Sequence, residues 1–283
     1  MIDLHLHTTA SDGRCAPEEL VERAWNAGIR TMSVTDHDTL AGVPAASAAA
    51  RSRGMLFVPG IEITSVHRGK DVHVLAYYVG EATPGLAVLL QQQRQQRLER
   101  AMEIADRLAA LGAPIDRATL IATATAPGGK SLARPQIAEQ LIAAGHVRSV
   151  AEAFEKYLGE DSPAYVPHRG ASPAEVVDLV SRGGGAASLA HPGYKGAGPA
   201  VVKDDLVPEL CDAGLLAIEA FHSSHDQQQQ AHYVALAQKH HLAITGGSDY
   251  HGEGTRRAEF FGVVNLPPEH FDEFERRAQA ARR

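Results

Sequence analysis

The stretch IDLHLHTTASDG, residues 2–13, alternates apolar and polar side chains and then ends in a loop of small polar residues. Alternate residues of a β-strand point to the same side, so His5 and His7 emerge together while the apolar residues between them face the other way. Asp12 follows in the loop. Two imidazoles side by side at the end of an apolar strand predict the first corner of a functional site.

Apolar strand-like runs alternate with helical patterns along most of the chain. The predicted strands are residues 2–6, 31–35, 56–61, 72–79, 186–190, 216–221, 242–245 and 260–264. The predicted helices are residues 17–26, 40–53, 172–181, 206–213, 227–240 and 268–281. Strands separated by helices indicate βα units around a parallel sheet or barrel.

One segment interrupts this alternation, because residues 84–167 are helical almost throughout. Amphipathic patterns cover residues 91–111, 134–144 and 150–158, and the turn-forming stretch 123–131 is expected to connect two of them. We therefore expect a barrel made of residues 1–83 and 168–283, with a helical insertion that covers the rim where the strands end.

Composition limits the class of protein. The 283 residues suit a large α/β domain with an insertion. The formal net charge of −7 argues against a broad surface for long nucleic acid. The 2 cysteines are too few for a disulfide framework. Neither a basic segment followed by an apolar run nor a membrane-length apolar run is visible, so we expect a cytoplasmic protein that does not enter membranes.

Side chains that can bind metals gather at the ends of the predicted strands. They are His5, His7, Asp12, Asp36, His37, Asp38, Glu62, His73, His191, Glu219, His222, Asp249 and His251. In βα barrels the C-terminal strand ends meet at one rim, where active sites form. Any one of these residues alone is more often a helix cap or a turn residue, but so many at one rim would leave buried polar groups unpaired. Imidazole and carboxylate together suit Mn, Zn or Fe, so a multinuclear metal site is predicted.

The motifs DLHLHTTASDG, TDHD, GIE, AHP and SDYH, in this order, resemble those of the polymerase and histidinol phosphatase (PHP) family of metal-dependent phosphoesterases. The resemblance implies a distorted (β/α)7 barrel, one strand fewer than the eight runs above. It also implies three metal positions, with Mn expected and Zn or Fe as alternatives. The first would be held by His5, His7, Glu62 and Asp249, the second by Glu62, His73 and His191, and the third by Asp12, His37 and His251. A site with two ions, the third position being weakly filled, remains open.

The chemistry implied by this family is in-line attack on a phosphate ester by a metal-bridging hydroxide, without a side-chain nucleophile. His222 is a candidate catalytic residue that protonates the leaving oxygen or grips a phosphate oxygen, and a supporting hydrogen bond is the equal alternative. Asp36 and Asp38 are expected to orient ligands or cap a helix. Ser223 and His225, with Ser224, are further candidates at the rim.

Substrate selection should depend on cations within the insertion. Arg134 begins a predicted helix beside Pro135 and could hold a second phosphate through its guanidinium. Lys130, Lys156, Tyr157 and His168 are similar candidates. This arrangement resembles the branch of the family that hydrolyses nucleoside 3′,5′-bisphosphates and short 5′-phosphorylated RNA, although Gln136 stands where relatives often have His.

The expected partner is therefore a small phosphorylated nucleotide or a short oligoribonucleotide, and the sequence leaves the oligomeric state open. A histidinol-phosphate-type phosphatase is the alternative within the same chemistry. A noncatalytic metal-binding PHP module is an alternative of another class. A C–N-cleaving amidohydrolase would also place metals in a barrel, but the sequence shows no obvious lysine metal bridge at a strand end.

Overall fold

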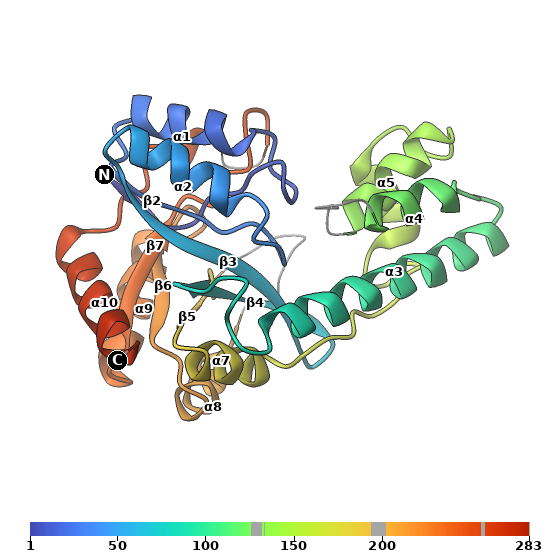
Figure 1. Cartoon of the computed structure of the whole chain (residues 1–283). Helices are drawn as coiled ribbons and strands as arrows, with labels where there is room; N and C mark the ends of the chain where they lie inside the picture. The colour runs from blue at the N-terminus through green and yellow to red at the C-terminus, as the bar shows by residue number, and fades with distance from the viewer. Residues whose placement is uncertain (126–131, 133, 194–201, 256–257, 283) are drawn as a thin grey trace. The chain divides into compact units, whose positions relative to one another are not determined.

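The computed structural model describes residues 1–282 apart from 126–131, 133, 194–201 and 256–257 (Figure 1). The chain divides into two compact units. The first comprises Met1–Leu89 together with Ala171–Arg283, and the second comprises Leu90–Gly170.

The first unit is built on a seven-stranded sheet whose strands follow their order in the sequence. The strands are β1 (Ile2–Asp3), β2 (Thr31–Val34), β3 (Leu56–His67), β4 (Lys70–Tyr77), β5 (Ala186–Leu189), β6 (Ala217–His222) and β7 (Ala243–Gly247). Neighbouring strands are parallel except that β4 runs antiparallel to both β3 and β5. The amide of Leu4 donates to the carbonyl of Gly246 at 3.0 Å, which brings the first and last strands together and nearly closes the sheet into a barrel.

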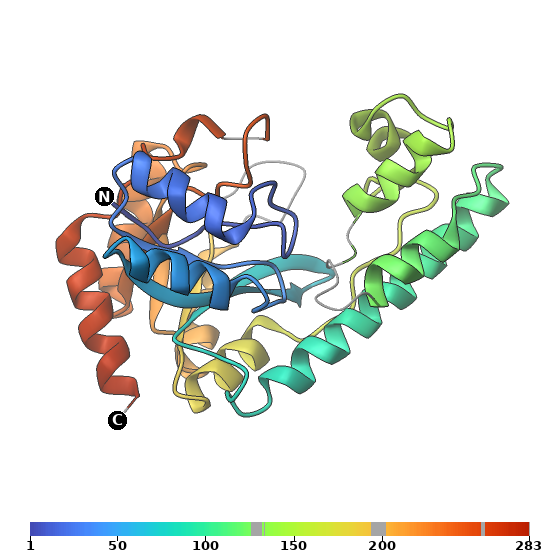
Figure 2. The same ribbon diagram turned by 45° about the horizontal axis from the view of Figure 1, so that its top comes forward.

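Helices pack on the outside of this barrel (Figures 1 and 2). They are α1 (Pro17–Asn26), α2 (Val43–Ser52), α7 (Pro173–Arg182), α8 (Val207–Asp212), α9 (Gln227–Lys239) and α10 (Pro268–Ala281). Two of them begin with reciprocal capping boxes, Ser172 with Glu175 in α7 and Asp226 with Gln229 in α9, which satisfy amides of the first turn. Helices α1 and α2 pack side by side, and Leu20 of α1 is fully buried in the same apolar cluster as strand β2.

The seven strands and their helices confirm the predicted (β/α)7 barrel, with three differences. The first predicted strand, residues 2–6, is regular only at Ile2–Asp3, so His5 and His7 lie in the segment after β1. Residues 260–264 do not form an eighth strand: a 3₁₀ turn spans Ala258–Phe260 and Val263 is 66% exposed, so these apolar residues do not alternate between core and solvent. Strand β3 does not end near Glu62, as predicted, but continues to His67 and turns back into β4. The turn residues Arg68 and Gly69 have φ of 53° and 78°. Positive φ at both positions matches the twist of a tight two-residue hairpin.

The second unit is helical. Helix α3 (Leu86–Ala110) runs into it and is followed by α4 (Arg117–Thr125), α5 (Arg134–Ala143) and α6 (Val150–Ala153), which continues as a π-helical turn over Phe154–Leu158. Leu108, Leu141 and Leu158 are fully buried in its apolar core. Helix α4 overlaps the connector predicted for residues 123–131. The first three of these residues are therefore helical, and the rest, including Lys130, lie outside the described part of the chain.

None of the helices in the described part of the chain combines the length and the apolar character needed to cross a membrane.

Candidate metal centre

The loop after β1 is tied to the end of β2 by one buried carboxylate. Asp36 Oδ1 accepts the amide of Thr8 and the hydroxyl of Ser11, both at 2.7 Å, and Oδ2 accepts the hydroxyl of Thr8 at 2.7 Å. Gly13 lets the loop fold tightly, since a Cβ there would lie 2.5 Å from the carbonyl oxygen of His7. This packing brings Asp12 back toward His7 in the segment after β1.

Glu62 lies at the middle of the candidate site, and five imidazoles surround its carboxylate. Oε2 lies 3.2 Å from ring nitrogens of His5, His7 and His37. Oε1 lies 2.7 Å from His73 Nδ1 and 2.9 Å from His191 Nε2. The backbone sets this arrangement, because an isolated parallel bridge joins His37, in the segment after β2, to Glu62 in β3, and the antiparallel hairpin pairs His73 with Thr64, two residues from Glu62. The β3–β4 hairpin thus supplies a carboxylate and an imidazole to one face.

Asp249 follows β7 and joins the same group. Its Oδ1 lies 3.2 Å from His7 Nε2 and 3.5 Å from His5 Nε2. Its backbone φ is 56°, and that of His191 is 24°, which places both residues in the left-handed region that non-glycine residues seldom adopt. Such backbone strain concentrates at functional sites.

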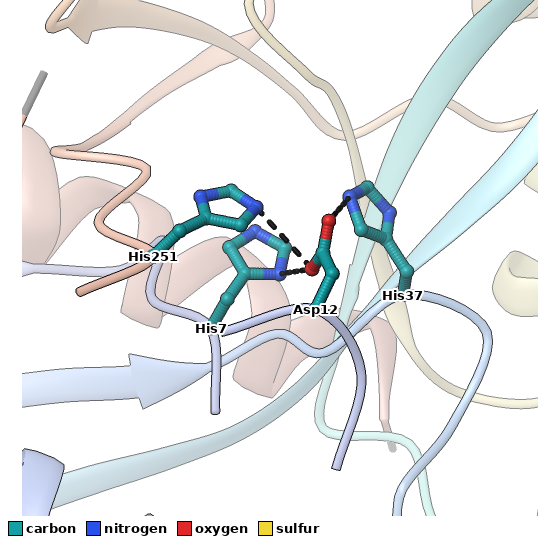
Figure 3. A group of neighbouring side chains, drawn as sticks. All are labelled: His7, Asp12, His37 and His251. Atoms are coloured by element: carbon teal, nitrogen blue, oxygen red, sulfur yellow. Dashed lines mark ion pairs between the residues drawn. The ribbon is translucent and has the colours of Figure 1, made fainter. Parts of the chain in front are cut away.

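A second group forms around Asp12. Figure 3 shows its carboxylate between the rings of His7 and His251 on one side and His37 on the other. Asp12 Oδ1 lies 3.3 Å from His251 Nε2 and 3.7 Å from His7 Nδ1, and Oδ2 lies 3.9 Å from His37 Nε2. The side chain of Asp12 is 40% exposed, whereas that of His7 is fully buried. This group therefore marks the side from which a small molecule can reach the cluster.

The electrostatics favour cations. Burial would raise the pKa of each carboxyl group, but the neighbouring imidazoles outweigh it and hold the pKa values of Glu62, Asp249 and Asp12 well below their usual range. Burial lowers the pKa of His37 to about 4, so this ring is neutral at pH 7 and offers a lone pair. The same carboxylates raise the pKa values of His5, His73 and His251, and that of His7 to about 10. A bound divalent cation would have to displace these protons, and carboxylates with imidazoles are the donor set expected for divalent transition metals.

The residues present fit metal ions. Four groups have ligand atoms close enough to share an ion: His7, Asp12, His37 and His251; His5, His7, Glu62 and Asp249; His37, Glu62 and His73; and His5, Glu219 and His222. Both ring nitrogens of His7 and Nδ1 of His37 are buried and make no well-formed hydrogen bond within the described part of the chain. Buried ring nitrogens are costly to leave unpaired, and a bound cation would satisfy them.

Three candidates at the end of β6 and in the loop after it lie beside this cluster. His222 is buried, its Nε2 lies 3.5 Å from Asp249 Oδ2, and its Nδ1 accepts the amide of Ser224 at 3.1 Å. The backbone amide must donate, so a neutral His222 carries its proton on Nε2, facing Asp249. Both ring nitrogens of His225 bond to backbone, Nδ1 to the carbonyl of Ala220 at 2.9 Å and Nε2 to the amide of Gly193 at 3.1 Å. The hydroxyl of Ser223 is buried. This geometry suits support of the cluster better than contact with substrate.

The remaining candidates belong to the second unit. Arg134 Nη1 donates to the carbonyl of Leu158 at 3.2 Å, and its guanidinium lies 5.5 Å from the ring of Phe154. Lys156 is exposed and pairs with Glu152 at 3.2 Å. Tyr157 packs on the apolar core of this unit. His168 is buried.

For two supporting residues, Glu219 and Asp36, the sequence does not predict which residues they contact. Glu219 was recognised as one of the strand-end residues but received no role, and Asp36 was expected to orient a ligand or cap a helix. Their hydrogen bonds reach His5 and Thr8, which lie 214 and 28 residues away. A carboxylate inside an otherwise apolar strand, as in the stretch AIEAF, was the available signal for Glu219.

Clustered imidazoles and carboxylates at the rim of a seven-stranded βα barrel define the class of protein: a βα barrel with a candidate metal centre. The family model of the PHP domain matches residues 3–157, and the chain belongs to this family.

Curated relatives extend over most of the chain. It is 36% identical over 251 residues to the 5′-3′ exoribonuclease Rnm of Escherichia coli, covering 88% of this chain and 84% of the relative. It is 32% identical over 267 residues to the 3′,5′-nucleoside bisphosphate phosphatase of Chromobacterium violaceum, covering 94% and 93%. It is 34% identical over 257 residues to a phosphoribosyl 1,2-cyclic phosphate 1,2-diphosphodiesterase of Eggerthella lenta, covering 89% and 94%.

Solved structures agree. A protein of Bifidobacterium adolescentis described as a metal-dependent phosphoesterase superimposes with a TM-score of 0.85 at 30% identity, covering 97% of this chain and 95% of the other. A protein of Chromobacterium violaceum described as an amidohydrolase with bound sulfate superimposes with a TM-score of 0.81 at 32% identity, covering 98% and 96%.

Proposed function

We propose that this PHP-family phosphoesterase releases the 3′-phosphate of nucleoside 3′,5′-bisphosphates. The observation that carries the proposal is the carboxylate of Glu62 among five imidazoles, with Asp12 and Asp249 on either side of the shared His7. A relative of nearly the same length carries the name of this activity.

The first and third ligand sets proposed from the sequence lie within these groups, whereas the group around Glu62 and His73 contains His37 in place of His191, whose Nε2 lies 2.9 Å from Glu62 Oε1. His5, His7, Glu62 and Asp249 would hold one ion; Glu62, His73 and His191 a second; and Asp12, His37 and His251 a third. Bound divalent ions would activate water near neutral pH and neutralise charge on the phosphoryl oxygens. Mn is the expected metal.

The protein's own groups have separate tasks in this proposal. Asp12 and His251, partly exposed with side-chain exposures of 40% and 21%, face incoming substrate. His5 and His7 are fully buried and form the part of the site farthest from solvent. His222 Nε2 lies 3.5 Å from Asp249 Oδ2 and would help to hold that carboxylate in place, which is the supporting alternative for this residue. Arg134 remains the predicted contact for the second phosphate.

Phosphate release from a panel of substrates tests the proposal. The Mn-loaded protein is offered adenosine 3′,5′-bisphosphate, adenosine 3′-monophosphate, 5′-phosphorylated RNA, a cyclic phosphodiester, histidinol phosphate and an N-acyl amide. We expect the bisphosphate to give the highest kcat/KM and Asp249→Ala to abolish turnover. A higher kcat/KM for the RNA would assign exoribonuclease activity instead, which the relative from Escherichia coli favours. Turnover of the amide alone, or of nothing above the Asp249→Ala background, would refute phosphoester hydrolysis.

A further inference from the structure

Glu219 is a buried carboxylate that contacts two candidate ligands from different strands. It lies in β6 and is fully buried. Its Oε1 accepts a hydrogen bond from His5 Nδ1 at 3.0 Å, and its Oε2 accepts one from the backbone amide of His191 at 2.8 Å. One side chain therefore links the segment after β1 to the segment after β5.

The first hydrogen bond determines which nitrogen of His5 can bind a metal. A His5 ring that binds a metal must be neutral, and with Nδ1 donating its proton to Glu219 such a ring would carry its lone pair on Nε2. That atom lies 3.2 Å from Glu62 Oε2 and 3.5 Å from Asp249 Oδ1. The carboxylate thus selects the tautomer in which His5 presents a lone pair to the other members of the first ligand set.

The second hydrogen bond holds the backbone of His191. This residue has a φ of 24°, a strained value that persists only where neighbouring groups fix it. The bond to Glu219 is one such restraint, and it aims the ring so that Nε2 lies 2.9 Å from Glu62 Oε1. Loss of this acceptor would leave a buried amide unpaired.

We infer that Glu219 is a positioning residue that aligns His5 and His191, the ligands of two different metal positions, through one buried carboxylate. This inference rests on the proposed metal centre. Glu219 also has ligand spacing with His5 and His222. Both of its oxygens accept hydrogen bonds, however, so the structure assigns it to orientation and not to the ligand set.

Glu219→Gln tests the inference because it keeps the size of the side chain and removes one of its two acceptors. A carboxamide can accept from His5 or from His191 but not from both. If its NH₂ group faces His5, the ring must place its proton on Nε2. If the NH₂ group faces the amide of His191, two donors oppose each other. We therefore expect metal affinity about 10–100-fold weaker than in the unsubstituted protein.

The measurement is a titration of the metal-free protein with Mn²⁺ that yields affinity and the number of bound ions. The matched control is Thr245→Val, since Thr245 is the cross-strand partner of Glu219 and its buried hydroxyl contacts Ser188 at 2.7 Å. Affinity should be unchanged in this control. Equal affinity in Glu219→Gln would overturn the inference. So would the loss of one ion with the remaining ions bound as tightly as before, because that result identifies a ligand.

A second measurement does not depend on the folding of the variant. In the Zn-loaded protein, ¹⁵N spectra of the imidazoles should show a proton on His5 Nδ1. A proton on Nε2 would overturn the inference. These results are separable from a failure of the proposed function, which would appear as an unsubstituted protein that binds no metal or releases no phosphate.

Discussion

Replacing Asp36 tests how the loop of Asp12 is held. Asp36 is almost completely buried, and its carboxylate accepts three hydrogen bonds from Thr8 and Ser11 at 2.7 Å. In Asp36→Ala the buried amide of Thr8 loses its acceptor and two hydroxyls lose a charged partner. An orphaned buried donor costs about 1–3 kcal/mol, so we expect the free energy of unfolding to fall by about 3 kcal/mol.

The same substitution should act unequally on the metal positions. The loop that carries Asp12 loses its anchor to β2, while His5 and Glu62 keep their own backbone pairing. The variant should therefore bind one ion more weakly, by about 10–100-fold, and retain the others. Urea unfolding of the metal-free protein and Mn²⁺ titration measure the two effects. Asp178→Ala, at an exposed position of α7, is the control and should change stability by less than about 0.5 kcal/mol. Equal losses of affinity at every metal position, or none at all, would refute this account of the loop.

Three further outcomes are expected. In Gly247→Ala a Cβ would lie 2.4 Å from Cβ of His5, so the free energy of unfolding, measured by thermal unfolding, should fall by about 2 kcal/mol and Mn²⁺ should bind more weakly. The control Gly80→Ala, whose Cβ would have nothing within 4 Å, should match the unsubstituted protein in both measurements. Equal effects of the two substitutions would contradict the packing argument. Burial lowers the pKa of His225 to about 4, below the usual value of about 6.5. As the pH falls, the unfolded chain therefore takes up a proton at this residue at a higher pH than the folded protein does. The free energy of unfolding should fall by about 1.4 kcal/mol per pH unit between about pH 6.5 and pH 4. Urea unfolding of metal-free His225→Gln should show a shallower slope over this range, and an unchanged slope would exclude His225 as its source. Arg134→Ala should raise KM for the bisphosphate about tenfold or more and leave KM for the 3′-monophosphate unchanged. Arg134→Lys should be intermediate, because lysine keeps the positive charge but not the two parallel N–H donors of the guanidinium. An unchanged KM for the bisphosphate in steady-state kinetics would remove Arg134 from the substrate contacts.

The sequence supported prediction of the barrel and the candidate ligand groups because both depend on local patterns. Imidazoles and carboxylates follow apolar strands, and parallel strand ends must meet at one rim. His5 and Asp249 could therefore be placed in one predicted site although they are far apart in the chain. The assignment of individual ligands to individual ions remains a prediction.

What local patterns could not supply were the contacts that hold the ligands. The link from Glu219 to His5 depends on how β6 and the segment after β1 meet inside the closed barrel, and no pattern within either strand records it. The antiparallel course of β4 was also missed, since the turn at Arg68 and Gly69 resembles an ordinary polar loop. The apolar residues 260–264 have the composition of a strand, but no strand in the described part of the chain pairs with them.

The near-closure of the barrel between its first and last strands also orders the events of folding. Glu62 and His73 come from one hairpin, only 11 residues apart, and can meet early. His5 meets Asp249 only when the two ends of the barrel join, as in the hydrogen bond from the amide of Asp249 to the carbonyl of His5 at 2.9 Å. Contacts between residues so distant in sequence form slowly because a long chain segment must first be closed. The nascent chain therefore cannot bring His5 and Asp249 together until the last strand has been synthesised, and metal binding at the ligand set proposed for these residues would be a late event of folding.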